Sequence, residues 1–243
     1  METVKVDINK LLESGAHFGH KTSRWHPQMA QYIYDKRNGA HIIDLTKTVE
    51  QLQKALEFLV KVSSEGKQIL IVGTKRQAQD ILKTLAEDVK MPYVTERWLG
   101  GMLTNWTTIG NQIKHLKEIE SKMLSGELAA KYSKLEVQRF QEEIEQMNKL
   151  YGGIKDMNSN PGAIFIIDIV HDANALKEAR KLNIPVVALT DTNANPTLVT
   201  YPIPCNDDAI KTIQLIADYV KQAIMAGRTS VKKVADKDNK EEK

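Results

Sequence analysis

AIFIID, residues 163–168, is a run of five apolar residues that ends on an aspartate. A short apolar run rich in isoleucine and valine is typical of a strand covered on both faces, as in a parallel sheet. Four other stretches predict strands on the same grounds: residues 41–45, 68–73, 93–96 and 184–191.

Helical patterns separate these strands. Apolar residues recur at helical spacing over residues 47–64, 75–89, 173–183 and 207–227. Thr74 is the expected N-cap of the second of these helices, and Gly227 the expected end of the last. Alternating strands and helices predict an α/β fold with a doubly wound, mostly parallel sheet of the Rossmann or flavodoxin type.

Residues 105–151 interrupt the alternation, because they contain no strand pattern. Two apolar stripes occur there. One joins Ile109, Ile113, Leu116 and Met123, with Glu120 interrupting it; the other, at heptad spacing, joins Val137, Phe140, Ile144, Met147 and Tyr151. A turn at residues 124–128 between them predicts an inserted antiparallel coiled-coil hairpin. The charges of its seven Lys/Arg and seven Glu cancel, which favours a solvated arm over one that binds nucleic acid electrostatically.

The expected organisation is therefore a discontinuous α/β domain, residues 1–104 and 152–228, with the hairpin inserted at 105–151. The charged segment 229–243 has few apolar residues and is expected to be disordered. We expect no membrane span, because the most apolar run is short and contains Asp168. The first residues have the pattern of neither a signal peptide nor a transit peptide. Cys205 is the single cysteine, so neither an internal disulfide nor a cysteine-rich zinc cluster can form.

A parallel sheet raises the alternative of a nucleotide-binding enzyme or sensor that uses the carboxyl edge of the sheet. Polar residues do follow the strands there, among them Lys75, Arg76, Asp168 and Asp191. However, VGTKRQA (72–78) has one glycine where a dinucleotide site needs three, and neither a P-loop nor a G-x-S-x-G nucleophile motif occurs. We therefore expect no catalytic residues.

A metal site is a second alternative. His17, His20, Asp191 and Asp207 are the candidate ligands, with His26 as a further imidazole. Competing interpretations are that the histidines cap backbone groups in a glycine-rich loop, and that Asp207 and Asp208 cap the last helix. The sequence favours these structural roles, so no metal is assigned.

The segment HFGHKTSRWHPQM (17–29) begins a locally basic region. Residues 17–37 contain four Lys/Arg, three His, Trp25 and two Tyr against the single acid Asp35. Cations neutralise phosphates and planar rings stack on unpaired bases, so this pattern favours RNA over a metal. Trp98 and Trp106, near Gly100 and Gly101, are expected to be buried rather than stacked on bases.

Longer motifs carry a resemblance to a known family. LLESGAHFGHKTSRWHPQMAQYIYDKRNGAHIIDLTKT (11–48), RWLGGMLTNWTTI (97–109) and IPVVALTDTNANP (184–196) resemble the bacterial and organellar ribosomal protein S2 family. The resemblance runs from about Ile8 to Arg228 and includes the inserted hairpin.

This resemblance implies a non-catalytic constituent of the small ribosomal subunit, in a 30S-type particle of the bacterial cytoplasm or of an organelle. The implied partners are 16S-type rRNA and neighbouring small-subunit proteins, including the large mRNA-binding protein S1, with no small-molecule substrate and no membrane. It implies no cofactor beyond Mg²⁺ associated with the rRNA. Carried over by position, the expected RNA-binding residues are Lys21, Thr22, Arg24, Trp25, Lys36 and Arg37, with Lys75, Arg76 and Arg97 as a second set.

Overall fold

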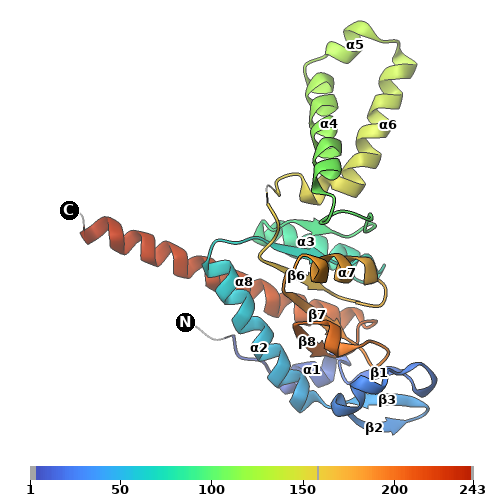
Figure 1. Ribbon diagram of the computed structural model, residues 1–243, viewed down its shortest axis with the longest axis vertical. Helices are drawn as coiled ribbons and strands as arrows, with labels where there is room; N and C mark the ends of the chain where they lie inside the picture. Colours follow the sequence, from blue (N-terminus) through green and yellow to red (C-terminus); the bar gives the residue numbers. More distant parts are fainter. Residues whose placement is uncertain (1–3, 158, 242–243) are drawn as a thin grey trace.

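The central element is a parallel sheet of five strands in the order β5-β4-β6-β7-β8. We analysed a computed structural model, which describes residues 4–157 and 159–241, the last twelve of them only as helix (Figure 1). The strands are β4 (Ile69–Val72), β5 (Tyr93–Val94), β6 (Ala163–Ile166), β7 (Val186–Thr190) and β8 (Tyr201–Pro204). The central three strands have no exposed residue, as expected of a sheet covered on both faces.

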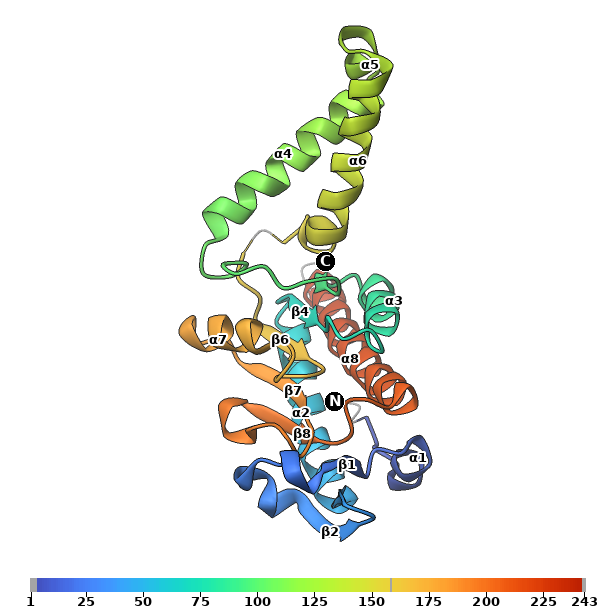
Figure 2. The ribbon, with the colours of Figure 1, turned by 90° about the vertical axis from the view of Figure 1, so that its right-hand side faces the viewer.

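Alternate residues of each central strand enter different cores. Ile69, Ile71 and Phe165 pack with α1 (Ile8–Ser14), α2 (Leu45–Ser64), α3 (Gln79–Val89) and α8 (Ile210–Glu241). Leu70 and Ile164 face α7 (Ala173–Lys181) and the segments that lead to and from the hairpin. Figure 2 shows α7 on one side of the sheet and α3 and α8 on the other. This arrangement confirms the predicted doubly wound α/β fold.

β8 is the one strand of the parallel sheet that the sequence did not predict. It contains Pro202 and Pro204, which donate no backbone hydrogen bond and weaken a strand pattern. Proline is tolerated here because β8 is the last strand of its sheet and pairs only with β7.

Two helix ends differ from expectation. Thr74 does not cap α3, which begins after Ala78; instead its hydroxyl donates to Asp172 Oδ1 over 2.7 Å. Gly227 does not end α8, which continues to Glu241 across most of the segment assigned to a disordered tail. A Cβ on Gly227 would lie 2.5 Å from the carbonyl oxygen of Val60. Glycine is therefore required by the close crossing of α8 over α2 rather than by a helix end.

A second sheet, of three antiparallel strands in the order β1-β3-β2, precedes the α/β core. It consists of β1 (Phe18–Lys21), β2 (Ile33–Arg37) and β3 (Ala40–Ile43), with two short 3-10 helices, Thr22–Arg24 and Pro27–Tyr32, between β1 and β2. Residues 41–45 were predicted as a strand, but β1 and β2 were expected to be loop. Asn38 and Gly39, both at positive φ, form the β2–β3 turn, and an Asn-Gly pair is the strongest short hairpin signal.

The inserted hairpin comprises α4 (Trp106–Leu124), α5 (Glu127–Lys131) and α6 (Lys134–Tyr151). It has a short helix at its tip where a simple turn was expected, and α4 and α6 separate toward the body (Figure 2). Ile119 is buried where the predicted stripe placed Glu120. Glu120 instead accepts hydrogen bonds from Asn148 and Lys155, each over 2.7 Å. Within the described part of the chain, no helix is long and apolar enough to cross a membrane.

Candidate nucleic-acid interface and the polar edge of the sheet

The predicted RNA-binding cations lie on the three-stranded sheet. Lys21 and Arg37 both pair with Ala40, one from each side, so the two cations lie in one row across the sheet. Directly opposite residues share a face, which places Lys21 and Arg37 on the same side and the next residue, Lys36, on the other. Lys21, Arg24, Lys36 and Arg37 are all exposed, and within the described residues no carboxylate lies within 4.0 Å of their side-chain nitrogens. Their charges are therefore free to meet an anion.

Trp25 packs against the middle strand of this sheet, next to the row that contains Lys21 and Arg37. Its ring lies 5.3 Å from that of His41, between ring centroids, while 40% of the residue stays exposed. His41 is buried, and neither ring nitrogen has a hydrogen-bond partner among the described residues. Burial, and then the charge of Lys36, lower the pKa of His41. Trp25 thus packs against the sheet and also presents an exposed ring surface.

Lys75 is held quite differently, at the carboxyl edge of the parallel sheet. Its Nζ lies 2.6 Å from Asp208 Oδ1, 2.7 Å from Asp207 Oδ1 and 3.2 Å from Asp168 Oδ2. Burial alone would lower the pKa of Lys75, but the neighbouring carboxylates, Asp207 foremost, raise it above its ordinary value. Three carboxylates therefore neutralise the charge of Lys75, so in the structure this lysine lacks the unpaired charge that the exposed cations of the amino-terminal strands have. Arg76 and Arg97 are exposed, as an RNA contact requires.

His20 joins this acidic edge to the three-stranded sheet. Its Nδ1 lies 2.9 Å from Asp191 Oδ2 and its Nε2 lies 3.5 Å from Asp208 Oδ2. The hydrogen bond to Asp191 raises the pKa of His20 despite partial burial. The His20 backbone also donates to Asp191 and to Thr192. Gly19 permits this contact, because a Cβ there would lie 2.6 Å from Thr192 Cγ2.

Three of the four candidate metal ligands come together. His20, Asp191 and Asp207 each offer an atom within 4.8 Å of the others, whereas His17 packs against Phe18 and its Nδ1 has no partner among the described residues. Burial, followed by repulsion from Asp168 and Asp191, raises the pKa of Asp207 to about 7. Since the Lys75 ammonium already lies on Asp207, a metal would have to compete with it for that carboxylate.

Of the predicted capping residues, His26 has that role, whereas Asp207 and Asp208 do not. Asp207 and Asp208 do not cap α8; Asn206 Oδ1 accepts from the backbone of Asp208 and of Ala209 instead. His26 does cap a backbone group, since its Nδ1 accepts from Gln28 N over 3.2 Å. Cys205 is buried, and burial raises the pKa of its thiol well above the ordinary value, consistent with an inert cysteine.

Trp98 and Trp106 were expected to be buried. Trp98 is 7% exposed and its Nε1 donates to Glu178 Oε1 over 3.0 Å, while Trp106 is half-buried. Neither ring is presented to solvent as openly as that of Trp25.

The acidic edge also argues against the nucleotide alternative. Asp168, Asp207 and Asp208 surround Lys75, and Asp191 lies nearby against His20. Such a surplus of carboxylates repels a phosphate chain. Asp168 further accepts from the backbone of Val170 and of His171, which uses donors that a phosphate would need.

Comparison with known proteins shows the family. A family model described as ribosomal protein S2 matches residues 11–227. The chain belongs to the ribosomal protein S2 family. It is 44% identical over 229 residues to the small ribosomal subunit protein uS2 of Fusobacterium nucleatum, covering 94% of this chain and 93% of that one. The proteins of the same name from Coprothermobacter proteolyticus and a Roseiflexus species are each 48% identical over 223 residues, which is 92% of this chain and 83% and 85% of theirs.

Membership of the ribosomal protein S2 family decides the class of function. The family is structural and non-enzymatic, so the nucleotide-dependent enzyme is rejected. The chain has a structural role in the small ribosomal subunit.

Proposed function

We propose that the chain binds small-subunit rRNA through its amino-terminal sheet, which we define as β1–β3 and their connections, residues 18–43. The observation that carries this proposal is the set of four exposed cations, Lys21, Arg24, Lys36 and Arg37, without an acidic partner among the described residues. Each unpaired cation can neutralise a phosphate and release a bound counterion. Paired cations elsewhere, such as Lys54 with Glu50 at 2.6 Å, would first have to leave a carboxylate.

Two neutral residues complete the proposed contact. Thr22 is half-buried, and its backbone N–H donates to Gly39 O over 2.9 Å, which fixes the segment that carries Arg24. The exposed part of Trp25 offers a planar surface on which an unpaired RNA base can stack. Since Lys36 lies on the opposite face from Lys21 and Arg37, the RNA contacts the end of the sheet at the β2–β3 turn and wraps both faces there.

The finer assignments follow from the family resemblance. We infer that the RNA is 16S-type, that neighbouring small-subunit proteins including S1 contact the chain, and that the assembly is a 30S-type subunit in the cytoplasm. The 92–94% coverage by bacterial relatives supports this inference. Mg²⁺ in such an assembly would belong to the RNA, and the protein needs no cofactor of its own.

Replacing Lys21, Arg24, Lys36 and Arg37 together by alanine tests the proposal. Dissociation constants for small-subunit rRNA are measured over a range of salt concentrations. A loss of four phosphate contacts should lower the slope of log K against log salt by about 3, at roughly 0.7–0.9 per contact.

The matched control replaces Lys54, Lys67, Lys131 and Lys221, each of which lies within 2.8 Å of a carboxylate. This variant loses the same net charge, so it should keep nearly the wild-type slope. Equal slopes for the two variants would show that total charge, rather than the amino-terminal sheet, governs binding.

A further inference from the structure

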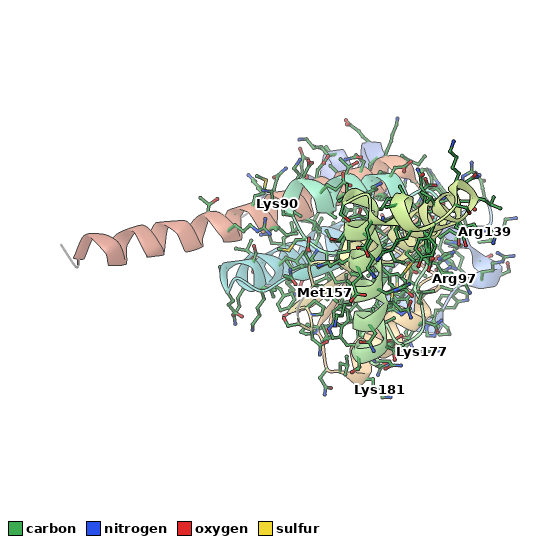
Figure 3. The ribbon with its side chains drawn as sticks, turned by 90° about the horizontal axis from the view of Figure 1, so that it is seen from above. Lys90, Arg97, Arg139, Met157, Lys177 and Lys181 are labelled. Carbon is green, nitrogen blue, oxygen red and sulfur yellow. The ribbon has the colours of Figure 1, made fainter. Side chains whose placement is uncertain are left out.

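A second group of exposed cations lies away from the amino-terminal sheet. Lys177, Arg180 and Lys181 project from α7, and Arg97 lies in the loop after β5. We call these four residues the α7 basic face. Figure 3 shows Arg97, Lys177 and Lys181 on the same side of the molecule when it is viewed from the hairpin end.

The architecture explains why these cations gather. Ala175, Leu176 and Ala179 are buried against the sheet, which turns Lys177, Arg180 and Lys181 outward. The loop with Arg97 is fastened to the same helix, because Trp98 Nε1 and Gly101 N donate to Glu178 Oε1 over 3.0 and 2.7 Å. The hydrogen bonds that join the loop to α7 are therefore made beside the cations.

Glu178, the acid of α7, does not neutralise these cations. Besides Trp98 and Gly101, its carboxylate accepts from Leu103 N, Thr104 N and the Thr104 hydroxyl, each over 3.0 Å. These neutral donors lower the pKa of Glu178 against the effect of its burial. Its charge is thus stabilised by the loop, and within the described residues no carboxylate lies within 4.0 Å of any cation of the α7 basic face.

The helix dipole accounts for only part of this pattern. Arg180 and Lys181 lie in the last turn of α7, where cations interact favourably with the helix C-terminus. Lys177 is one turn earlier, and Arg97 is in a different segment. A polyanion is the ligand that matches a surface of unpaired cations.

We propose that the α7 basic face is a second rRNA-phosphate surface. This inference rests on the proposed RNA-binding function and extends it. Figure 2 shows α7, the segment after β7 and the amino-terminal sheet one below another along the same side of the molecule. His26 N donates to Thr192 O over 2.7 Å, which joins the amino-terminal sheet to the segment after β7. One RNA surface can therefore contact both groups of cations.

The test compares two triple variants of the full chain. One carries Lys177→Ala, Arg180→Ala and Lys181→Ala, which keep good helix formers on α7. The other carries Lys54→Ala, Lys67→Ala and Lys221→Ala, and so loses the same net charge from ion-paired sites. Binding to small-subunit rRNA is measured against salt, and thermal unfolding verifies that both variants fold.

The α7 variant should lower the slope of log K against log salt by about 2, at roughly 0.7–0.9 per phosphate contact, while the control keeps nearly the wild-type slope.

Loss of slope in the fourfold amino-terminal-sheet variant but not in the α7 variant would overturn this inference and leave the proposed function intact. Failure of the wild-type chain to bind rRNA would overturn the proposed function itself. Normal RNA binding with reduced incorporation into subunits would assign the α7 basic face to a protein neighbour, which also contradicts the inference. If the α7 variant does not fold, Arg97→Ala alone should still lower the slope by nearly 1, and no change would count against the proposal.

Discussion

Lysine side chains have opposite environments in the amino-terminal sheet and at the carboxyl edge of the parallel sheet. Lys21 and Lys36 are exposed, and no described carboxylate lies within 4.0 Å of either Nζ, whereas Lys75 is mostly buried among three aspartates. In the first region a lysine is a charge available to a partner, and in the second it is part of the interior of the fold. The position of a lysine in the sequence therefore does not establish its role until its acidic neighbours are known.

Lys75→Met should produce the largest loss of stability that this comparison predicts. Removing the ammonium leaves Asp207, which is 1% exposed, and the largely buried Asp168 without their cation. Breaking one side of a buried ion pair costs about 3–5 kcal/mol. Urea unfolding of the variant and of the wild-type chain measures the change.

Combining Lys75→Met with Asp207→Asn provides the control. The double variant removes one acid together with the cation, so it should recover part of the lost free energy of unfolding. A loss below about 1 kcal/mol in the single variant would show that Lys75 behaves like an exposed cation, and the contrast between the two regions would be wrong.

Glu178→Leu should have the next largest effect, because it extends the comparison to an acid satisfied by neutral donors. The substitution leaves several N–H groups of the 98–104 loop without their acceptor. A buried donor left unpaired costs about 1–3 kcal/mol, so we expect a loss of about 3 kcal/mol in the free energy of unfolding. Glu178→Gln, which keeps one acceptor oxygen, should lose less. Equal losses for Leu and Gln would show that charge, rather than acceptor geometry, is what the loop requires.

The fold was predictable where one pattern dominates. The buried strands β4, β6 and β7 are continuous apolar runs, and α2 and α7 have clear apolar stripes. β1 and β2 were missed because most of their residues are exposed and neither strand is a continuous apolar run. The end of α8 was missed because the tight contact of Gly227 with Val60 depends on a helix crossing, and no local pattern records such a crossing.

The candidate site was predictable only in part, for a related reason. Basic residues 21–37 and polar strand ends can be located along the chain, and the strand ends do meet at one edge. However, whether a cation is free depends on distant acids: Asp168 and Asp207 follow Lys75 by 93 and 132 positions. In the same way, Glu178 reaches Gly101 over 77 positions. Local charge counts cannot detect either pairing.

The two regions should also respond to pH in opposite directions. Burial lowers the pKa of His41 in the folded state, so below about pH 6.5 the unfolded chain binds this proton more readily and the amino-terminal sheet loses stability as the pH falls. The pKa of Asp207 is raised to about 7 from 3.8. Between those values the folded state holds a proton that the unfolded state releases, so the carboxyl edge gains stability as the pH falls. His20, with its raised pKa, acts in the same direction as Asp207.

Amide hydrogen exchange at pH 7.5 and 5.5, corrected for intrinsic rates, can separate the regions. Protection should fall in β3 and hold or rise in β7 and β8 at the lower pH. His41→Leu removes the titrating imidazole, so the loss of protection in β3 should disappear in that variant. A parallel fall in both sheets would argue against separate titrations.

Lys36→Ala should have the smallest effect on stability and provides the sharpest contrast with Lys75→Met. Lys36 is exposed and has no described ion pair to lose, so the free energy of unfolding should change by less than about 0.5 kcal/mol. Because a phosphate contact is removed, the slope of log K against log salt for rRNA should fall by nearly 1. Lys83→Ala is the matched control, since Lys83 is an exposed lysine of α3 on the other side of the parallel sheet and likewise has no described ion pair. A Lys36→Ala variant with reduced stability and the same salt slope as Lys83→Ala would show that the cations of the amino-terminal sheet stabilise the fold. The distinction between free and internally paired lysines would then be wrong in the case where it should be clearest.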